Sequence, residues 1–257
     1  MGQSISIPTA NPFQSSSFFS SSSSKRGPGF FTKLQIPVAK PKDFPALIGS
    51  CMSAASARTQ EFLTFSDPEG KFCPSPQVLN QVFLATYIAR SVGLDITDTF
   101  NCTTMTPEQR ILLGADWVWA LLEKPTKNPR VQIAVRVLHL PEMGAGPPES
   151  GSESIQMAQM ESSSRSVCER MVEFCTSIGK DCYALFLFFG KRDDRENIYG
   201  VLSNNFGAAV GKCSQIDRAL IENFLKGAKT FETPSGMMQA IVAKKKGDPL
   251  TLVVKFS

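Results

Sequence analysis

The chain has 257 residues, of which 42% are hydrophobic and 19% are charged, so it is long and apolar enough to bury a sizeable core. Its longest apolar runs fall short of the ~20 residues that a membrane-spanning helix needs, and we therefore predict no transmembrane helix. Seven cysteines, an odd number, occur without an apolar signal sequence, which argues against a secreted protein with a disulfide framework.

The formal net charge of +4 is concentrated near the amino terminus. Five cations precede the first acidic residue, Asp43, and the remaining chain holds 22 Lys or Arg against 23 Asp or Glu. A nucleic-acid-binding protein usually carries its basic excess on the folded domain, so the neutral body argues against that class. The five cations are Lys25, Arg26, Lys33, Lys40 and Lys42.

Residues 1–42 are rich in serine and have no hydrophobic periodicity, which predicts a disordered tail. The opening Met-Gly-Gln-Ser-Ile-Ser places Gly2 and Ser6 as N-myristoylation requires. One acyl chain gives marginal membrane affinity, and the five cations would add electrostatic attraction to an anionic leaflet. Two alternatives remain open: a chance match in an ordinary tail, and a cleaved organelle transit peptide, since the segment is basic and lacks acids.

From Asp43 onward the pattern predicts a folded body that begins with helices. The first covers about 46–62, and the second follows the cap Ser75 and ends near Gly93. After a polar loop, 106–123 is apolar on nearly every side at helical spacing. Its start has a Thr106 cap with Pro107 and Gln109 in the expected positions, so we predict one central helix that contains both tryptophans.

In the second half of the body, the pattern of apolar residues predicts mainly strands. These are a half-buried strand at 131–138, a strand at 182–189 buried on both faces and paired in a hairpin with 197–203, and a second hairpin of 237–243 with 250–256. Helices are expected at 165–178 and around Ile216, Leu220 and Phe224, and a flexible insertion at about 141–164. The lysines of the turn at 244–249 are interpreted as turn solvation or edge protection.

Together these elements predict an α+β fold, with a helical amino-terminal half packed on a mostly antiparallel sheet from the carboxy-terminal half. We expect one domain over 43–257, because the parts that flank the insertion are each small for a core of their own.

The residues give little support for an enzyme. His139, the single histidine, ends a strand without a nucleophile motif beside it, so a surface position is the simpler interpretation. Cys168, Cys175 and Cys182 lack the short spacing of zinc sites and are interpreted as small core residues. The segment 207–213 is one residue short of a phosphate-binding loop and ends in cysteine instead of Ser or Thr. We predict no catalytic residue, metal, cofactor or small-molecule substrate.

Several blocks of the sequence resemble the Rab-15 effector family, in the same order and over roughly residues 55–205. The most specific is Gly114-Ala115-Asp116-Trp117-Val118-Trp119. The other blocks are Glu61–Phe65, Lys71–Pro74, Leu79–Leu84, Glu173–Cys175, Ile178–Gly179, Asp181–Cys182, Leu185–Phe186, Phe188–Gly190 and Gly200–Val201.

This resemblance implies a non-enzymatic effector that binds a GTP-bound Rab GTPase of the Rab-15 type. It also implies a cytoplasmic protein, peripheral on early or recycling endosome membranes, that regulates receptor recycling from the endocytic recycling compartment. A small organelle-targeted hydrolase or transferase with a cleaved presequence is the alternative.

Trp117 and Trp119 are the aromatic candidates for a partner contact, with Asp116 beside them, because binding energy concentrates on aromatic and arginine side chains. The alternative for the tryptophans is plain core packing. For Asp116 it is a buried carboxylate with a structural hydrogen-bond partner.

Overall fold

The computed structural model describes residues 44–140, 153–162, 164–190, 198–211 and 215–256, and within them six strands form one sheet. The order is β1-β2-β3-β4-β5-β6, and neighbouring strands are antiparallel except for the parallel pair β3 and β4. The fold class is α+β, as predicted. The strands are β1 (Phe100–Thr104), β2 (Trp117–Leu122), β3 (Pro129–His139), β4 (Cys182–Phe189), β5 (Ile198–Ser203) and β6 (Thr251–Lys255).

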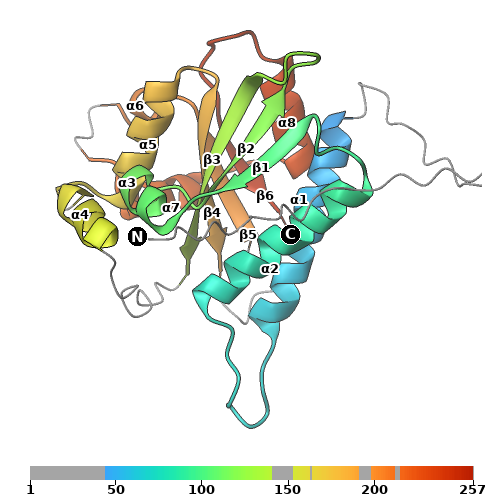
Figure 1. The fold of residues 1–257 in the computed structure, drawn as a ribbon, viewed down its shortest axis with the longest axis vertical. Coiled ribbons are helices and arrows are strands. Elements are labelled where there is room, and N and C mark those ends of the chain that lie inside the picture. The colour runs from blue at the N-terminus through green and yellow to red at the C-terminus, as the bar shows by residue number, and fades with distance from the viewer. Residues whose placement is uncertain (1–43, 141–152, 163, 191–197, 212–214, 257) are drawn as a thin grey trace, which may run out of the picture. The chain divides into compact units, whose positions relative to one another are not determined.

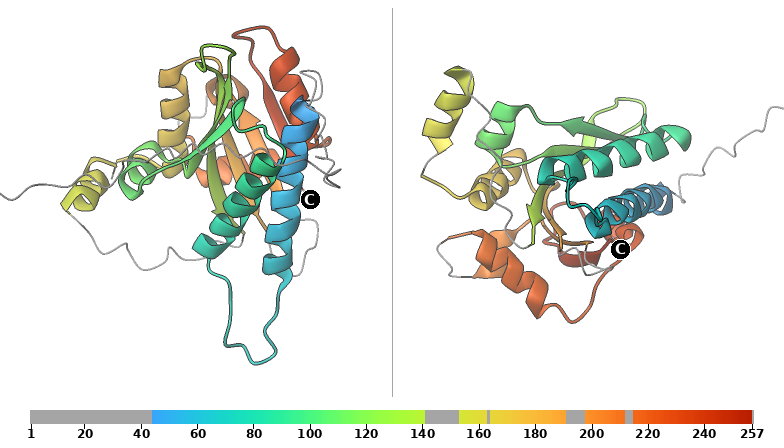
Figure 2. Two further views of the ribbon diagram at one scale, coloured as in Figure 1. Left: turned by 45° about the vertical axis from the view of Figure 1, so that its right-hand side comes forward. Right: turned by 90° about the horizontal axis from the view of Figure 1, so that it is seen from below.

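Helices cover both faces of this sheet (Figures 1 and 2). One face packs on α1 (Phe44–Thr64), α2 (Pro76–Gly93) and α8 (Pro234–Ala243). The other packs on α5 (Val167–Ile178), α6 (Phe206–Val210) and α7 (Arg218–Gly227). Outside this layer, α3 (Pro107–Leu113) lies against α5, and α4 (Glu153–Ser162) lies against α3. None of the described helices is both long and apolar enough to cross a bilayer.

β4 separates the two cores, because its side chains alternate between them. Tyr183, Leu185, Leu187 and Phe189 join the core under α1, α2 and α8. Cys182, Ala184, Phe186 and Phe188 join the core under α5, α6 and α7. All eight residues are buried, which confirms the prediction of a strand buried on both faces. Its hairpin with β5 is confirmed as well.

The prediction of one helix over 106–123 was wrong beyond its first two turns. The start is as expected: the Thr106 hydroxyl accepts a hydrogen bond from the Gln109 N–H, and the Gln109 side chain accepts one from the Thr106 N–H. Gly114 then ends α3 in the left-handed conformation, at φ 73°. A β-carbon at Gly114 would lie 2.3 Å from the carbonyl oxygen of Val167, so this close approach to α5 requires glycine.

β2 follows instead of a continued helix, with side chains that alternate between buried and half-buried. A run of six apolar residues fits a strand period as well as a helical one, which is why the helical spacing misled the prediction.

Other differences lie in segments with similarly short patterns. Residues 237–243 belong to α8 and not to a strand, because Thr233 caps the helix by accepting from the Gly236 N–H and Pro234 occupies its first turn. Of the second predicted hairpin, only β6 is a strand. β1 lies where a loop was expected, and α4 lies in the predicted insertion, whose residues 141–152 are outside the described part.

Candidate interaction surface

Both tryptophans lie in the core beneath α2. Trp117 and Trp119 are each 0% exposed. The ring centroid of Phe83 is 5.7 Å from that of Trp117, and the centroid of Tyr87 is 5.2 Å from that of Trp119. Both tryptophans are therefore core residues, and neither indole is available to a partner in this conformation.

Asp116 is likewise held by structural partners. Its carboxylate accepts a hydrogen bond from the Val137 N–H at 2.8 Å and one from the Arg136 guanidinium at 3.3 Å. The side chain is 11% exposed. Asp116 thus fixes the beginning of β2 against β3. This matches the alternative of a buried carboxylate with a structural hydrogen-bond partner.

Two exposed aromatic side chains lie close together in the loop between α1 and α2, residues 65–75, called here the α1–α2 loop. Phe65 is 44% exposed and Phe72 is 52% exposed. Their ring centroids are 5.8 Å apart in an edge-to-face arrangement, and we call them the Phe65–Phe72 pair. The loop extends away from the sheet beyond the ends of both helices (Figures 1 and 2).

Hydrogen bonds within the loop hold this pair in place. The Asp67 carboxylate accepts from the Phe72 N–H at 2.7 Å and from the Glu69 N–H at 3.1 Å. These bonds, the one from Phe72 most of all, hold the pKa of Asp67 below its ordinary value. Gly70 donates to the Asp67 carbonyl and has φ +66°, which closes the turn. The aromatic pair is therefore presented on an ordered loop.

Charged side chains lie within the α1–α2 loop and on the adjoining end of α1. Arg58 and Glu61 form an ion pair on the last turns of α1, and the Arg58 guanidinium lies 5.3 Å from the ring centroid of Phe62. Lys71 pairs with Glu69 inside the loop. An exposed apolar centre with a polar rim is the usual anatomy of a protein interface. The arrangement suits a protein partner.

Sequence reasoning missed this pair, although a signal was present. Phe65 follows the last residue of α1, and Phe72 stands next to Lys71 in a segment of turn-forming residues. Neither belongs to a helical or strand period, so burial does not explain its apolar character. Both also fall within blocks that resemble the Rab-15 effector family.

His139 is half-buried, where the sequence suggested a surface position. Its ring packs edge-to-face on Phe189 at a centroid distance of 5.4 Å. Burial, and to a lesser extent the nearby charges of Arg136 and Arg218, lower the pKa of His139 to about 4. The imidazole is therefore neutral at physiological pH and belongs to the aromatic core beneath α2.

The three regularly spaced cysteines are buried, as predicted for small core residues. Burial raises the pKa of the Cys168 thiol to about 11. A hydrogen bond with Cys182 raises the pKa of Cys175 well above its ordinary value. Over the described ranges, no three His, Cys, Asp or Glu side chains are grouped as metal ligands would be.

Some of the residues that the sequence analysis singled out are not among those that the structure describes. Gly2 and the five basic residues of the tail lie outside the described residues. Of the segment 207–213, the first part belongs to α6, and residues 212 and 213 are outside the described part.

Comparison with known proteins decides the family. The family model of the Rab15 effector matches residues 42–252. The chain belongs to the Rab15 effector family. The Rab15 effector protein of Mus musculus is 26% identical over 213 residues, which cover 80% of this chain and 90% of that relative. The blocks of resembling sequence cover roughly residues 55–205. The family match is longer and runs from the start of α1 into β6.

Proposed function

We propose that this member of the Rab15 effector family binds a Rab GTPase in its GTP-bound form. The observation that carries the proposal is the family match over residues 42–252, which includes the whole α1–α2 loop. An effector distinguishes the nucleotide by contacting switch regions that are ordered only in the presence of the γ-phosphate. Membership in an effector family favours an interaction module over a catalyst.

The Phe65–Phe72 pair is the contact that we assign to the Rab. Aromatic anchors with a charged rim supply most of the binding energy in many protein interfaces. Phe65 and Phe72 are exposed, and the backbone of Phe72 is held by its bond to Asp67, which reduces the conformational entropy lost when the pair is covered. Trp117 and Trp119, the earlier candidates, would act through the fold that they stabilise.

The experiment is a pull-down of the full chain against a panel of Rab proteins, including Rab15, each loaded with GDP or a non-hydrolysable GTP analogue. Retention of a Rab in the GTP form alone is the expected result. Equal retention of both nucleotide forms would contradict the effector proposal, and so would failure of every Rab in the panel with protein shown to be folded.

The proposal extends to the membrane on which the Rab is bound. We infer that an acyl chain on Gly2, with Lys25, Arg26, Lys33, Lys40 and Lys42, holds the protein on early or recycling endosomes, where it regulates receptor recycling. The support is the opening sequence motif and the five cations that precede the first acid.

Mass spectrometry of the protein isolated from cells tests this anchor. A myristoylated Gly2, and loss of endosomal localisation in Gly2→Ala, are the expected results. A mature amino terminus near residue 42 would contradict the anchor and favour the organelle-targeted hydrolase or transferase instead. A Ser16→Ala variant, which keeps Gly2 and all five cations, is the control for a change in the tail that leaves the anchor intact.

A further inference from the structure

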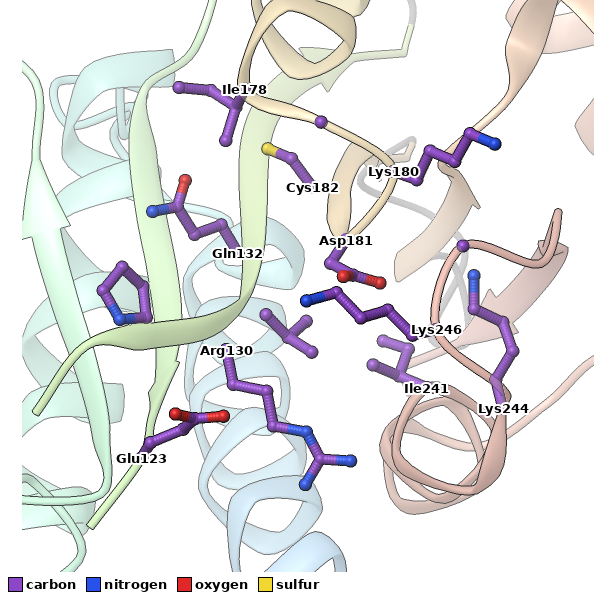
Figure 3. Close-up of a pocket in the computed structure, with 14 residues that line it drawn as sticks. Glu123, Arg130, Gln132, Ile178, Lys180, Asp181, Cys182, Ile241, Lys244 and Lys246 are labelled. Atoms are coloured by element: carbon purple, nitrogen blue, oxygen red, sulfur yellow. The ribbon is translucent and has the colours of Figure 1, made fainter. Parts of the chain in front are cut away.

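A pocket of about 740 Å³ opens where β3 and β4 begin, and four cations line it. Arg130 lies at the start of β3, and Lys180 precedes β4. Lys244 and Lys246 come from the turn between α8 and β6. Figure 3 shows Arg130 and Lys246 reaching into the hollow, with Lys180 and Lys244 at its edge, although the four side chains belong to three separate segments of the sequence.

The walls of the pocket are fixed by Asn204. Its side-chain amide donates to the carbonyl oxygen of Lys180 at 2.7 Å and to that of Asp248 at 2.9 Å. Its amide oxygen accepts from the Leu250 N–H at 2.8 Å. One side chain thus ties the α5–β4 turn, which carries Lys180, to the α8–β6 turn, which carries Lys244 and Lys246. A preorganised site of this kind loses less entropy when a ligand binds.

The four cations have no ion-pair partner within the part of the chain that the structure describes, whereas Arg58, Lys71, Arg136 and Arg165 elsewhere do. Lys244 donates to the Asp248 carbonyl and lies 5.2 Å from the ring centroid of Tyr183. Burial lowers its pKa, against the opposing influence of Asp181 and Asp248. Concentrated positive charge in a concave site attracts anions.

Two carboxylates in the pocket indicate which class of anionic ligand it suits. Glu123 and Asp181 also line the pocket. A carboxylate repels phosphate but accepts hydrogen bonds from hydroxyl groups. Among the described residues that line the pocket there is no aromatic side chain on which a nucleobase could stack. The lining therefore suits a hydroxylated ring that carries several phosphates better than a nucleotide or a bare phosphate ion.

We propose that this pocket binds an inositol polyphosphate group, as a soluble molecule or as the head group of a phosphoinositide lipid. Arg130, Lys180, Lys244 and Lys246 pair with the phosphates, and Glu123 and Asp181 accept hydrogen bonds from the ring hydroxyls. This assigns the turn lysines a binding role in addition to the solvation that the sequence suggested. Ile178, which lines the pocket and is 52% exposed, would contact the acyl region in the lipid case.

The test uses the full chain and two probes. The soluble probe is an inositol trisphosphate, measured by calorimetry. The lipid probe is a phosphatidylcholine vesicle that contains phosphatidylinositol bisphosphate, with a control vesicle brought to the same charge by phosphatidylserine. The variant is Lys246→Glu, and the matched control is Lys245→Glu, the same charge change one residue away in a side chain that does not line the pocket.

Lys246→Glu is expected to weaken binding at least about tenfold, the effect of losing one charge-assisted contact. Lys245→Glu is expected to change binding less than about threefold, as for an exposed charge. Binding of the soluble probe alone supports a free ligand, and binding of the bisphosphate vesicle alone supports the lipid source.

The proposal is overturned if neither probe binds, if phosphatidylserine binds equally well, or if the two lysine variants weaken binding to the same extent. Rab binding is a separate measurement, and neither result depends on the other, because the pocket uses no residue of the α1–α2 loop.

Discussion

Two aromatic pairs, Trp117 with Trp119 and Phe65 with Phe72, lie in opposite environments. The tryptophans are 0% exposed and contact each other at a ring-centroid distance of 5.7 Å. The phenylalanines contact each other at 5.8 Å but are about half exposed. The ring distances are nearly equal, so the surroundings and not the contact set the role of each pair. We expect the buried pair to determine stability and the exposed pair to determine binding.

The interior pair should give the largest change in stability. Trp119→Ala leaves a cavity between Tyr87 and Phe100, whose ring centroids lie 5.2 and 6.4 Å from that of Trp119. Truncation of a buried tryptophan costs about 3–5 kcal/mol in the free energy of unfolding. Urea denaturation followed by circular dichroism measures it. A loss below about 1 kcal/mol would mean that the indole is not packed as described.

The next largest effect is a dependence of stability on pH through His139. Its ring contacts Phe189, which in turn contacts Phe83 in the same aromatic core. Its folded pKa of about 4 is below its ordinary value of 6.5, so the unfolded chain binds the proton first as the pH falls. The free energy of unfolding should therefore decrease between about pH 6.5 and pH 4, by up to about 3 kcal/mol.

Urea denaturation across this pH range, with His139→Gln as the comparison, isolates this contribution. The variant is expected to lose less stability than the native chain over the same interval. Parallel curves for the two proteins would show that the imidazole does not titrate as its burial implies.

Asp116 should follow with an intermediate effect. Asp116→Ala removes the acceptor of the Val137 N–H and the partner of Arg136. Loss of a partner to a buried donor costs about 1–3 kcal/mol. Rab binding by the folded fraction should stay unchanged, because Asp116 is structural. Weaker binding by folded Asp116→Ala protein would restore Asp116 as a partner-contacting residue.

The smallest change in stability is expected in the α1–α2 loop. Asp67→Ala frees the Phe72 N–H, so hydrogen exchange at this amide should become faster while the urea midpoint hardly changes. Binding of the GTP-loaded Rab should weaken, because the aromatic pair is no longer held. Unchanged exchange at Phe72 would contradict the role of Asp67 in ordering the loop.

Capping residues and strand alternation made much of this fold predictable from the sequence. Ser75 and Gly93 indicated the ends of α2, Gly179 the end of α5, and the alternation after Pro129 indicated β3. The path after Gly114 was not predictable, because it depends on the close approach of Val167, a contact between distant segments. Thr233 and Pro234 marked the start of α8, but the short apolar run that follows fits both periods.

The role of the tryptophans and the position of the basic pocket could not be predicted from the sequence, again because both depend on contacts between distant segments. Apolar character drew attention to the tryptophans, and only their burial showed that they belong to the core. The basic pocket was not predictable either, because Arg130, Lys180 and Lys246 are brought together by the order of the strands and by the hydrogen bonds of Asn204.

The most direct test of the central claim compares Phe72→Ala with Phe231→Ala in binding to the GTP-loaded Rab. Phe231 is a matched control because it is 44% exposed and also contacts one aromatic ring, that of Tyr199, but lies outside the α1–α2 loop. With both variants folded, Phe72→Ala should bind at least about tenfold more weakly and Phe231→Ala within about twofold of the native chain. Equal affinity of the two variants would show that the Rab binds elsewhere on the protein.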